Sequence, residues 1–513
     1  MEQRRGAPHG SEAPSSLLRH LHRVIGHLNP VHQIDESPSR VYTAPFIPMT
    51  MASQSVADGT SEGSSRFRRI TIKRVLACLA VLAAPILMLF LIHHYAVNVP
   101  FRDEWDELSV VPKAYNGTLD FASLFAQQNE HRPITSRLAS ILIARTSQLN
   151  LVHEMYLGFA LEFLSLILIW RMLVRSLKET APALIIPLTI VSSLMLFWTV
   201  AWENWIWGIA SFQYLGAVFL AVLAVWGLTT WRGRWGGVAV GAASTALAIF
   251  TTGHGFALIP VGLFWLLVSG ISDRRIHWLQ ICLFGLVGAL CTVLYLQNYH
   301  SPGFYVVGAS RVRPLNTFLY AITYLGSPFW TTRWGVAPVL GCLGLCGFIA
   351  GAGYLRKFTP SWLDAIGPWI LLASYTTING IVTALGRIDF GVDQANQPRY
   401  RSVVIPFWIS FAVVLSMVAV HALSRFDRRQ LRPAVAAIVV VFLAGYSYLY
   451  YRGLGYIRFQ SQLCTAGLPY ILDYDKAPDE KLRPLHPYPP TVRALSRKLD
   501  QYHLGPFANY SVR

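Results

Sequence analysis

The residues best suited to chemistry lie at positions 101–107, which read FRDEWDE and place four carboxylates within five positions. The segment directly follows the first long apolar run, and carboxylates beside lipid are costly unless they are used. They can deprotonate an acceptor hydroxyl or hold a divalent cation. We therefore identify Asp103, Glu104 and Asp106 as candidate catalytic residues. Glu107 is a candidate substrate-binding residue, although a solvated acidic loop is the alternative interpretation of the whole segment.

A second polar motif, Asn-Glu-His-Arg at positions 129–132, lies in the polar stretch that separates the first two apolar runs. Residues 119–128 and 134–149 have the apolar spacing of amphipathic helices that lie flat on a membrane. Two such helices would frame a groove between the two motifs. The candidate substrate-binding residues here are Glu130, His131 and Arg132. The alternative is that the histidine and the arginine cap a helix and anchor it at the interface.

A third motif, Trp-Glu-Asn-Trp-Ile-Trp-Gly, occupies positions 202–208. Tryptophans are common at both membrane interfaces, so an aromatic belt is one interpretation. Aromatic faces also stack on sugar rings, and a glutamate and an asparagine among the indoles are unexpected in a simple belt. The candidate substrate-binding residues are Glu203, Asn204, Trp205 and Trp207.

A fourth motif is the turn at positions 251–255, which reads TTGHG. The glycines on both sides of His254 permit either a sharp reversal or a close approach to a ligand. The histidine is the residue that a turn alone does not explain, so we include His254 among the candidate binding residues.

A fifth motif spans residues 386–401 and contains three arginines. Arginine binds phosphate through two parallel hydrogen bonds, so these side chains could bind the phosphate of an anionic lipid carrier. Pairing with nearby aspartates, or plain headgroup contact, is the alternative. The candidate binding residues are Arg387, Asp389, Gln394 and Arg401.

The composition indicates the elements that must position these motifs. Hydrophobic residues make up 53% of the 513 residues and charged residues only 13%, against about 25% charged in an average soluble chain. The net charge of +17 resides in short clusters between apolar runs, which is the positive-inside pattern of membrane proteins and not a nucleic-acid-binding groove. The six cysteines show neither a disulfide framework nor zinc spacing.

We predict an all-α, polytopic transmembrane bundle of about eleven spans, because each apolar run approaches the ~20 residues that cross a bilayer. A disordered cytosolic leader at 1–65 precedes a basic flank and first span at 66–96. An extracytoplasmic loop at 97–151, the bundle at 152–452 and an extracytoplasmic tail at 453–513 follow. The later spans are expected at 154–174, 181–200, 207–230, 237–252, 255–270, 278–297, 336–355, 362–385, 402–424 and 433–451.

Loop charge predicts the orientation. Every second loop is basic, which places the N-terminus in the cytosol and the C-terminus and all five motifs on the extracytoplasmic side. Residues 317–334 are interrupted by polar residues, glycine and proline, so we expect an interfacial helix there. The sequence thus predicts a multi-pass protein of the plasma (inner) membrane.

The layout resembles the C-type glycosyltransferase superfamily, whose members use polyprenyl-phosphate-linked sugars. The resemblance covers roughly residues 75–425 and is closest to uncharacterised multi-pass proteins with DxWD, NEHR, WENWxWG and GRxxFGxxQ motifs, found here at 103–106, 129–132, 202–208 and 386–394. It implies an inverting transfer to a glycan, lipid or protein acceptor and contacts with membrane lipids. The charge pattern gives no nucleic-acid partner, and the carboxylates of the first motif could hold a divalent cation. Gln397-Pro398 departs from the small polar residues of that set.

Two other functions are compatible with the sequence. A flippase or transporter of a lipid-linked saccharide would need polar residues on both faces or mid-membrane, whereas an enzyme would concentrate them on one face. A non-catalytic assembly protein would tolerate replacement of the carboxylates. The sequence contains no GxxxxGK[ST], HExxH or GxSxG motif.

Overall fold

The computed structural model describes residues 59–300, 314–329, 335–359, 361–423 and 428–508. The chain divides into two compact units, Met1–Arg66 and Phe67–Arg513. Of the first unit only the start of a helix is described, so most of the leader expected at 1–65 lies outside the described residues. The described part of the second unit is all-α, as predicted, and its one β-type contact is an isolated bridge between Gln128 and His131.

Ten helical segments in the described residues are long and apolar enough to cross a bilayer, so the chain is a multi-pass integral membrane protein. The predicted span at 237–252 forms a shorter apolar helix, α12 (Trp235–Ile249). The ten are built on α2 (Gly59–Tyr95), α7 (Val152–Leu177), α8 (Ile185–Leu196), α11 (Gly216–Thr230), α13 (Leu258–Ser272), α14 (Trp278–Leu296), α16 (Val336–Phe358), α17 (Trp362–Arg387), α18 (Pro398–Leu423) and α19 (Arg428–Leu472), some extended by short 3-10 or π segments.

The helices expose apolar stripes that only lipid can cover. On α14 the exposed side chains include Leu286, Leu290 and Val293, which recur at helical spacing on one face. In water such a surface would drive aggregation, whereas hydrocarbon solvates it. These exposed apolar stripes agree with the prediction, made from composition, that the protein lies in a membrane.

The helix α15 (Pro314–Gly326) covers most of the segment for which we expected an interfacial helix. It is shorter than each of the ten spanning segments, but its C-terminal half, from Tyr320 to Gly326, is buried in the bundle. A Cβ at Gly341 of α16 would lie 1.8 Å from the carbonyl oxygen of Ile322, so the two backbones are in direct contact, as small residues allow in membranes. Thus α15 is a packed element of the bundle.

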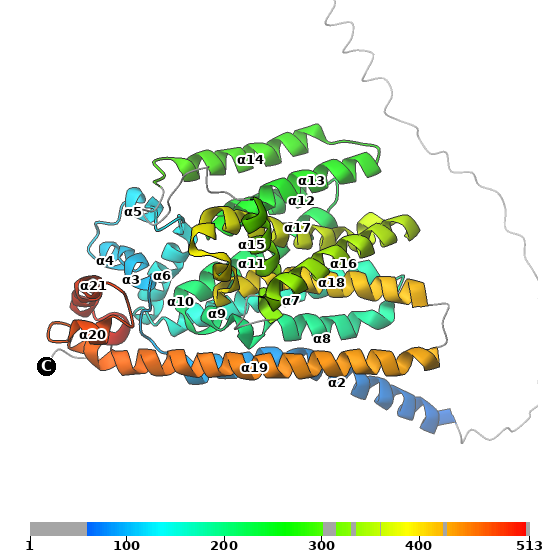
Figure 1. The fold of residues 1–513 in the computed structure, drawn as a ribbon, viewed down its shortest axis with the longest axis horizontal. Helices are drawn as coiled ribbons and strands as arrows, with labels where there is room; N and C mark the ends of the chain where they lie inside the picture. Colours follow the sequence, from blue (N-terminus) through cyan, green and yellow to red (C-terminus); the bar gives the residue numbers. More distant parts are fainter. Residues whose placement is uncertain (1–58, 301–313, 330–334, 360, 424–427, 509–513) are drawn as a thin grey trace, which may run out of the picture. The chain divides into compact units, whose positions relative to one another are not determined.

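Short helices gather at one end of the bundle, as Figure 1 shows for α3 (Glu104–Glu107), α4 (Val110–Tyr115), α5 (Phe121–Phe125) and α6 (Ile134–Ser147). The last two are the amphipathic helices predicted in this loop, although α5 is shorter than expected. The helix α19 continues beyond the predicted span to Leu472. It carries α20 (Asp479–Leu482) and α21 (Pro489–Gln501) to the same end, which is where we expected the C-terminal tail.

Candidate functional site

A cavity of about 360 Å³ lies at this end of the bundle, and most of its walls carry polar side chains. It is lined by Arg102, Asp103, Glu107, Gln128, Asn129, His131, Pro133, Trp207, Ile209, Ala210, Gln213, Tyr214, Arg387, Phe390 and Arg399. Four of the five motifs therefore contribute to one cavity, although they lie up to about three hundred residues apart in the chain.

The turn of helix at α3 separates the four carboxylates of the first motif. Asp103 and Glu107, four positions apart on the same helix face, line the cavity. Glu104 points into the protein, where its carboxylate accepts the N–H groups of Phe101 at 2.9 Å and Ile209 at 3.0 Å. Asp106 lies 3.3 Å from Nε2 of His486 in the C-terminal tail. Of the three candidate catalytic residues, only Asp103 lines the cavity.

Glu107 belongs to a buried polar cluster behind the cavity. The hydroxyl of Ser136 donates a hydrogen bond to its carboxylate, and Nε2 of Gln213 donates another at 3.1 Å. Burial is the main reason that the pKa of Glu107 is raised to about 8. Because a carboxyl with this pKa is mostly protonated at pH 7, Glu107 presents a neutral acid to the cavity.

Another carboxyl, that of Glu154, lies next to this cluster and was not among the predicted site residues. Glu154, near the start of α7, accepts a hydrogen bond from the Ser140 hydroxyl. A Cβ at Gly208 would lie 2.7 Å from carboxylate oxygens of both Glu104 and Glu154, so the glycine lets the two groups approach. Burial first, and then the Glu154 charge, hold the pKa of Glu104 well above its ordinary value. Glu104 is therefore a poor candidate for a general base that must be ionised.

The second motif joins the cavity to the fourth motif, the turn at 251–255. Nδ1 of His131 accepts the N–H of Gly253 at 3.2 Å, so the neutral imidazole carries its proton on Nε2. That nitrogen lies 3.4 Å from Glu130, which in turn pairs with Arg387. Burial, followed by the charge of Arg399, lowers the pKa of His131 to about 4. His131 is thus a neutral positioning group at pH 7.

The arginines divide into two groups. Arg387 and Arg399 line the cavity. Arg401 instead donates to the carbonyl oxygens of Val200 and Asn396, both at 2.8 Å. Arg132 likewise donates to three carbonyl oxygens, those of Tyr295, Phe125 and Gln297. Arg132 thus uses all three guanidinium nitrogens, and Arg401 uses both terminal nitrogens although its buried Nε has no partner. Because these terminal nitrogens already bond carbonyl groups, Arg401 and Arg132 act as braces between segments.

Arg399 differs from every other arginine at the cavity. No hydrogen bond or ion pair joins its guanidinium to another residue in the part of the chain that the structure describes, and its Nε is buried. The guanidinium lies 5.7 Å from the centre of the Tyr400 ring. A partly buried, unpaired guanidinium in a cavity wall is suited to bind an anion.

The third motif mainly holds this arrangement in place. Asn204 donates to the carbonyl of Arg399 at 2.9 Å and to the Ser402 hydroxyl at 2.8 Å. Glu203 lies 3.7 Å from Arg102. Trp207 lines the cavity, whereas Trp205 is a core residue whose indole N–H donates to a carbonyl.

The remaining candidates lie outside the cavity wall. His254 is buried behind Tyr214, with 5.5 Å between the ring centres, and its Nδ1 bonds the Thr252 hydroxyl. Gln394 accepts a hydrogen bond from Gln397, and Asp389 is exposed. These residues shape the surroundings of the cavity without lining it.

Backbone conformation adds a sign of functional constraint. Arg102 and Asn129 both line the cavity and both have φ of 48°, a left-handed conformation that side chains other than glycine seldom adopt. The N–H of Arg102 donates to the Leu485 carbonyl at 2.7 Å. The C-terminal tail therefore helps to hold a strained residue of the site.

Several lining residues were absent from the predicted set. Arg102 and Arg399 stand beside predicted residues in their motifs, and the positive charge of each was a usable signal. Gln213 and Tyr214 lie in the π-helical segment Ser211–Leu215, and such bulges are frequent at functional sites. A glutamine in an otherwise apolar span was the one available signal there.

No group of three or more His, Cys, Asp or Glu side chains in the described ranges converges in a way that could hold a metal ion. The possible divalent cation stays a prediction. No protein-family model, curated protein or solved structure matches the chain.

Proposed function

We propose that this protein is a membrane glycosyltransferase that moves a sugar from a polyprenyl-phosphate-linked donor to an extracytoplasmic acceptor. The observation that carries the proposal is the single cavity whose walls include Asp103, the unpaired guanidinium of Arg399 and Arg387. This pairing of a base with phosphate-binding groups is what transfer from a sugar phosphate requires.

The proposed reaction is one displacement at the anomeric carbon. The Asp103 carboxylate takes the proton of the acceptor hydroxyl as the hydroxyl oxygen bonds to that carbon. The bond between the carbon and the phosphate oxygen breaks, and its electrons stay on the polyprenyl phosphate. Since attack comes from the side opposite the leaving group, the configuration inverts.

The arginines would stabilise the departing phosphate. Arg399 has unused donors, and Arg387 can add to them while Glu130 holds it in position. Interactions that strengthen as charge builds on the phosphate lower the barrier and not merely the dissociation constant of the donor. This assigns to Arg399 the role that the sequence suggested for Arg401.

The other lining groups would bind the sugar. Trp207 offers an apolar ring against which a sugar face can stack. Glu107, protonated at neutral pH, and Gln213 can donate to or accept from sugar hydroxyls. Phe390 is an exposed apolar residue of the cavity wall, suited to contact with the prenyl chain of the donor.

The test is to delete the gene in the source cell and to compare lipid-linked saccharides and surface glycans by mass spectrometry. A transferase predicts accumulation of a polyprenyl-phosphate sugar and loss of one sugar from a glycan. Wild-type protein should restore the glycan, and Asp103→Asn at equal expression should not. Unchanged glycans in the deletion strain refute the proposal, and full restoration by Asp103→Asn favours a flippase or a non-catalytic role.

A further inference from the structure

A second cavity, of about 220 Å³, lies between α13, α16 and α17 and is separate from the candidate active site. It is lined by Phe264, Trp265, Val268, Ala352, Gly353, Arg356, Trp362, Leu363, Gly367 and Ile370. All but one of these side chains are uncharged and most are apolar. The exception is Arg356, in the last turn of α16.

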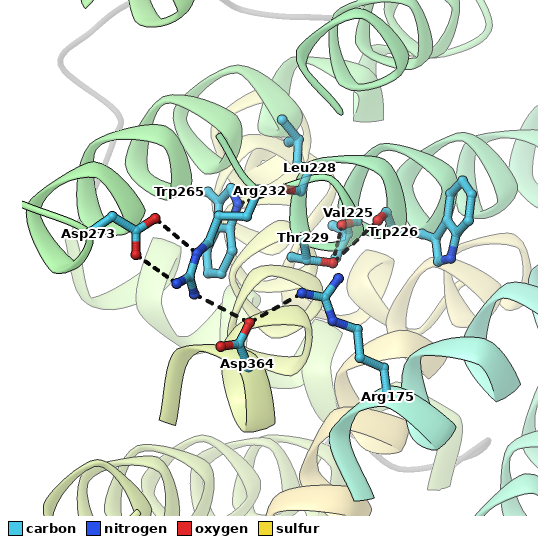
Figure 2. Close-up of polar contacts among 9 residues, drawn as sticks. All are labelled: Arg175, Val225, Trp226, Leu228, Thr229, Arg232, Trp265, Asp273 and Asp364. Atoms are coloured by element: carbon cyan, nitrogen blue, oxygen red, sulfur yellow. Dashed lines mark hydrogen bonds and ion pairs between the residues drawn. The ribbon is translucent and has the colours of Figure 1, made fainter. Parts of the chain in front are cut away.

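The cavity lies near the helix ends that carry the basic loops. There Arg232 binds Asp273 through two hydrogen bonds, of 2.7 and 3.1 Å. Figure 2 shows that Arg232 and Arg175 also converge on Asp364, at 3.3 and 3.2 Å. The charges of the two aspartates are thus matched by those of these two arginines, and neither aspartate pairs with Arg356.

Arg356 has no such carboxylate. Within the described ranges no ion pair involves it, and its guanidinium lies 5.5 Å from the centre of the Trp362 ring. The adjacent Lys357 is also exposed and lies near the ring of Phe358. The cavity therefore combines an apolar interior with the uncompensated positive charge of Arg356 in its wall, and Lys357 follows directly on the same helix outside the wall.

We propose that this cavity binds an anionic phospholipid, with an acyl chain in the apolar interior and the headgroup phosphate at Arg356 and Lys357. The surrounding helices all count among those long and apolar enough to cross a bilayer, and Phe264 is 50% exposed, so the cavity lies where acyl chains are the solvent. Basic pockets between transmembrane helices suit anionic headgroups. A soluble anion would gain nothing from the apolar walls.

Charge gives the expected preference. Each basic residue near a membrane surface strengthens binding of anionic lipid roughly fivefold. Two such residues predict that phosphatidylglycerol binds about 10- to 30-fold more tightly than phosphatidylcholine with the same acyl chains.

The chain offers a direct way to fill the cavity. A Cβ added to Gly353 meets no atom within 4 Å, so the side chain of Gly353→Leu begins in open space at the cavity wall. Gly445 in α19 is equally open and lies outside the cavity, which makes Gly445→Leu a matched control. Arg356→Gln removes the charge and leaves the cavity open.

The experiment is native mass spectrometry of the delipidated full-length protein, titrated with phosphatidylglycerol, phosphatidylcholine or inorganic phosphate. We expect one phosphatidylglycerol to bind with the stated preference, and inorganic phosphate not to compete for it. Gly353→Leu and Arg356→Gln should each weaken this binding at least fivefold, whereas Gly445→Leu should match wild type.

Three results would overturn the proposal: equal binding of the two lipids to wild type, competition by inorganic phosphate, or unchanged binding in Arg356→Gln. If Gly353→Leu does not fold, the open-cavity variant Arg356→Gln still decides the question. The outcome does not depend on the glycosyltransferase proposal, because no residue of the first cavity is involved.

Discussion

Glu107 gives a prediction whose size follows from its surroundings. Burial raises its pKa from 4.5 to about 8, so between these values the folded protein holds a proton that the unfolded chain has released. Stability therefore falls as pH rises through this window and receives no pH-dependent contribution from Glu107 below it. One pKa unit corresponds to about 1.4 kcal/mol, so the free energy of unfolding can fall by at most roughly 5 kcal/mol across the whole window.

The substitution Glu107→Gln should remove this contribution. An uncharged amide keeps the size of the side chain and can bond both Ser136 and Gln213, but it has no proton to lose. At pH 5 the variant and the wild type should have similar melting temperatures. At pH 8 the variant should be more stable by about 2 to 5 kcal/mol, within the same limit.

The assay is thermal unfolding of purified protein in detergent at a series of pH values from 5 to 8.5. The control is Glu179→Gln, because that side chain is 82% exposed and the substitution makes the same change of glutamate to glutamine outside the buried cluster. A difference in melting temperature between Glu107→Gln and wild type that is the same at pH 5 and pH 8 would refute the reasoning. It would mean that Glu107 ionises in the folded protein as it does in water.

Three further predictions concern the site and the topology. Asp103→Asn should reduce turnover by about 100- to 10,000-fold, as expected for loss of a general base, and should leave binding of the polyprenyl-phosphate donor intact in a sedimentation assay. Arg399→Lys should lower turnover because it loses the planar donor pair, whereas Arg401→Lys should mainly lower the melting temperature by breaking a brace. The opposite ranking of these two variants would exchange their roles. A cytosol-specific reporter should give signal after Lys357 but not at the C-terminus, and signal at both would contradict the assigned orientation.

The acidic segment at 101–107 was only partly predictable from the sequence. Its position after the first span, and the two amphipathic helices that follow it, were predictable from spacing. Which carboxylate reaches the cavity was not, because one helical turn directs Asp103 outward and Glu104 inward. Glu104 is held by the N–H of Ile209, and Asp106 by His486 of the tail, and neither contact leaves a pattern in the local sequence.

The arginines illustrate the same limit. Residue type indicated phosphate binding for Arg387, Arg399 and Arg401 alike. Only packing distinguishes them. Both terminal nitrogens of Arg401 bond carbonyl groups, those of Val200, which is 201 residues away in the chain, and Asn396, which is 5 residues away. No donor of Arg399 is bonded in the part of the chain that the structure describes.

The sequence by itself determined the class of the protein and the end of the bundle at which polar motifs collect. Hydropathy and loop charge act locally, since each span must satisfy its own backbone and shield its own length from water. The tertiary structure decided which side chains bind and which brace, which carboxyl keeps its proton, and that the tail supports Arg102. These properties depend on burial and on partners distant in sequence, and both arise only when the helices pack.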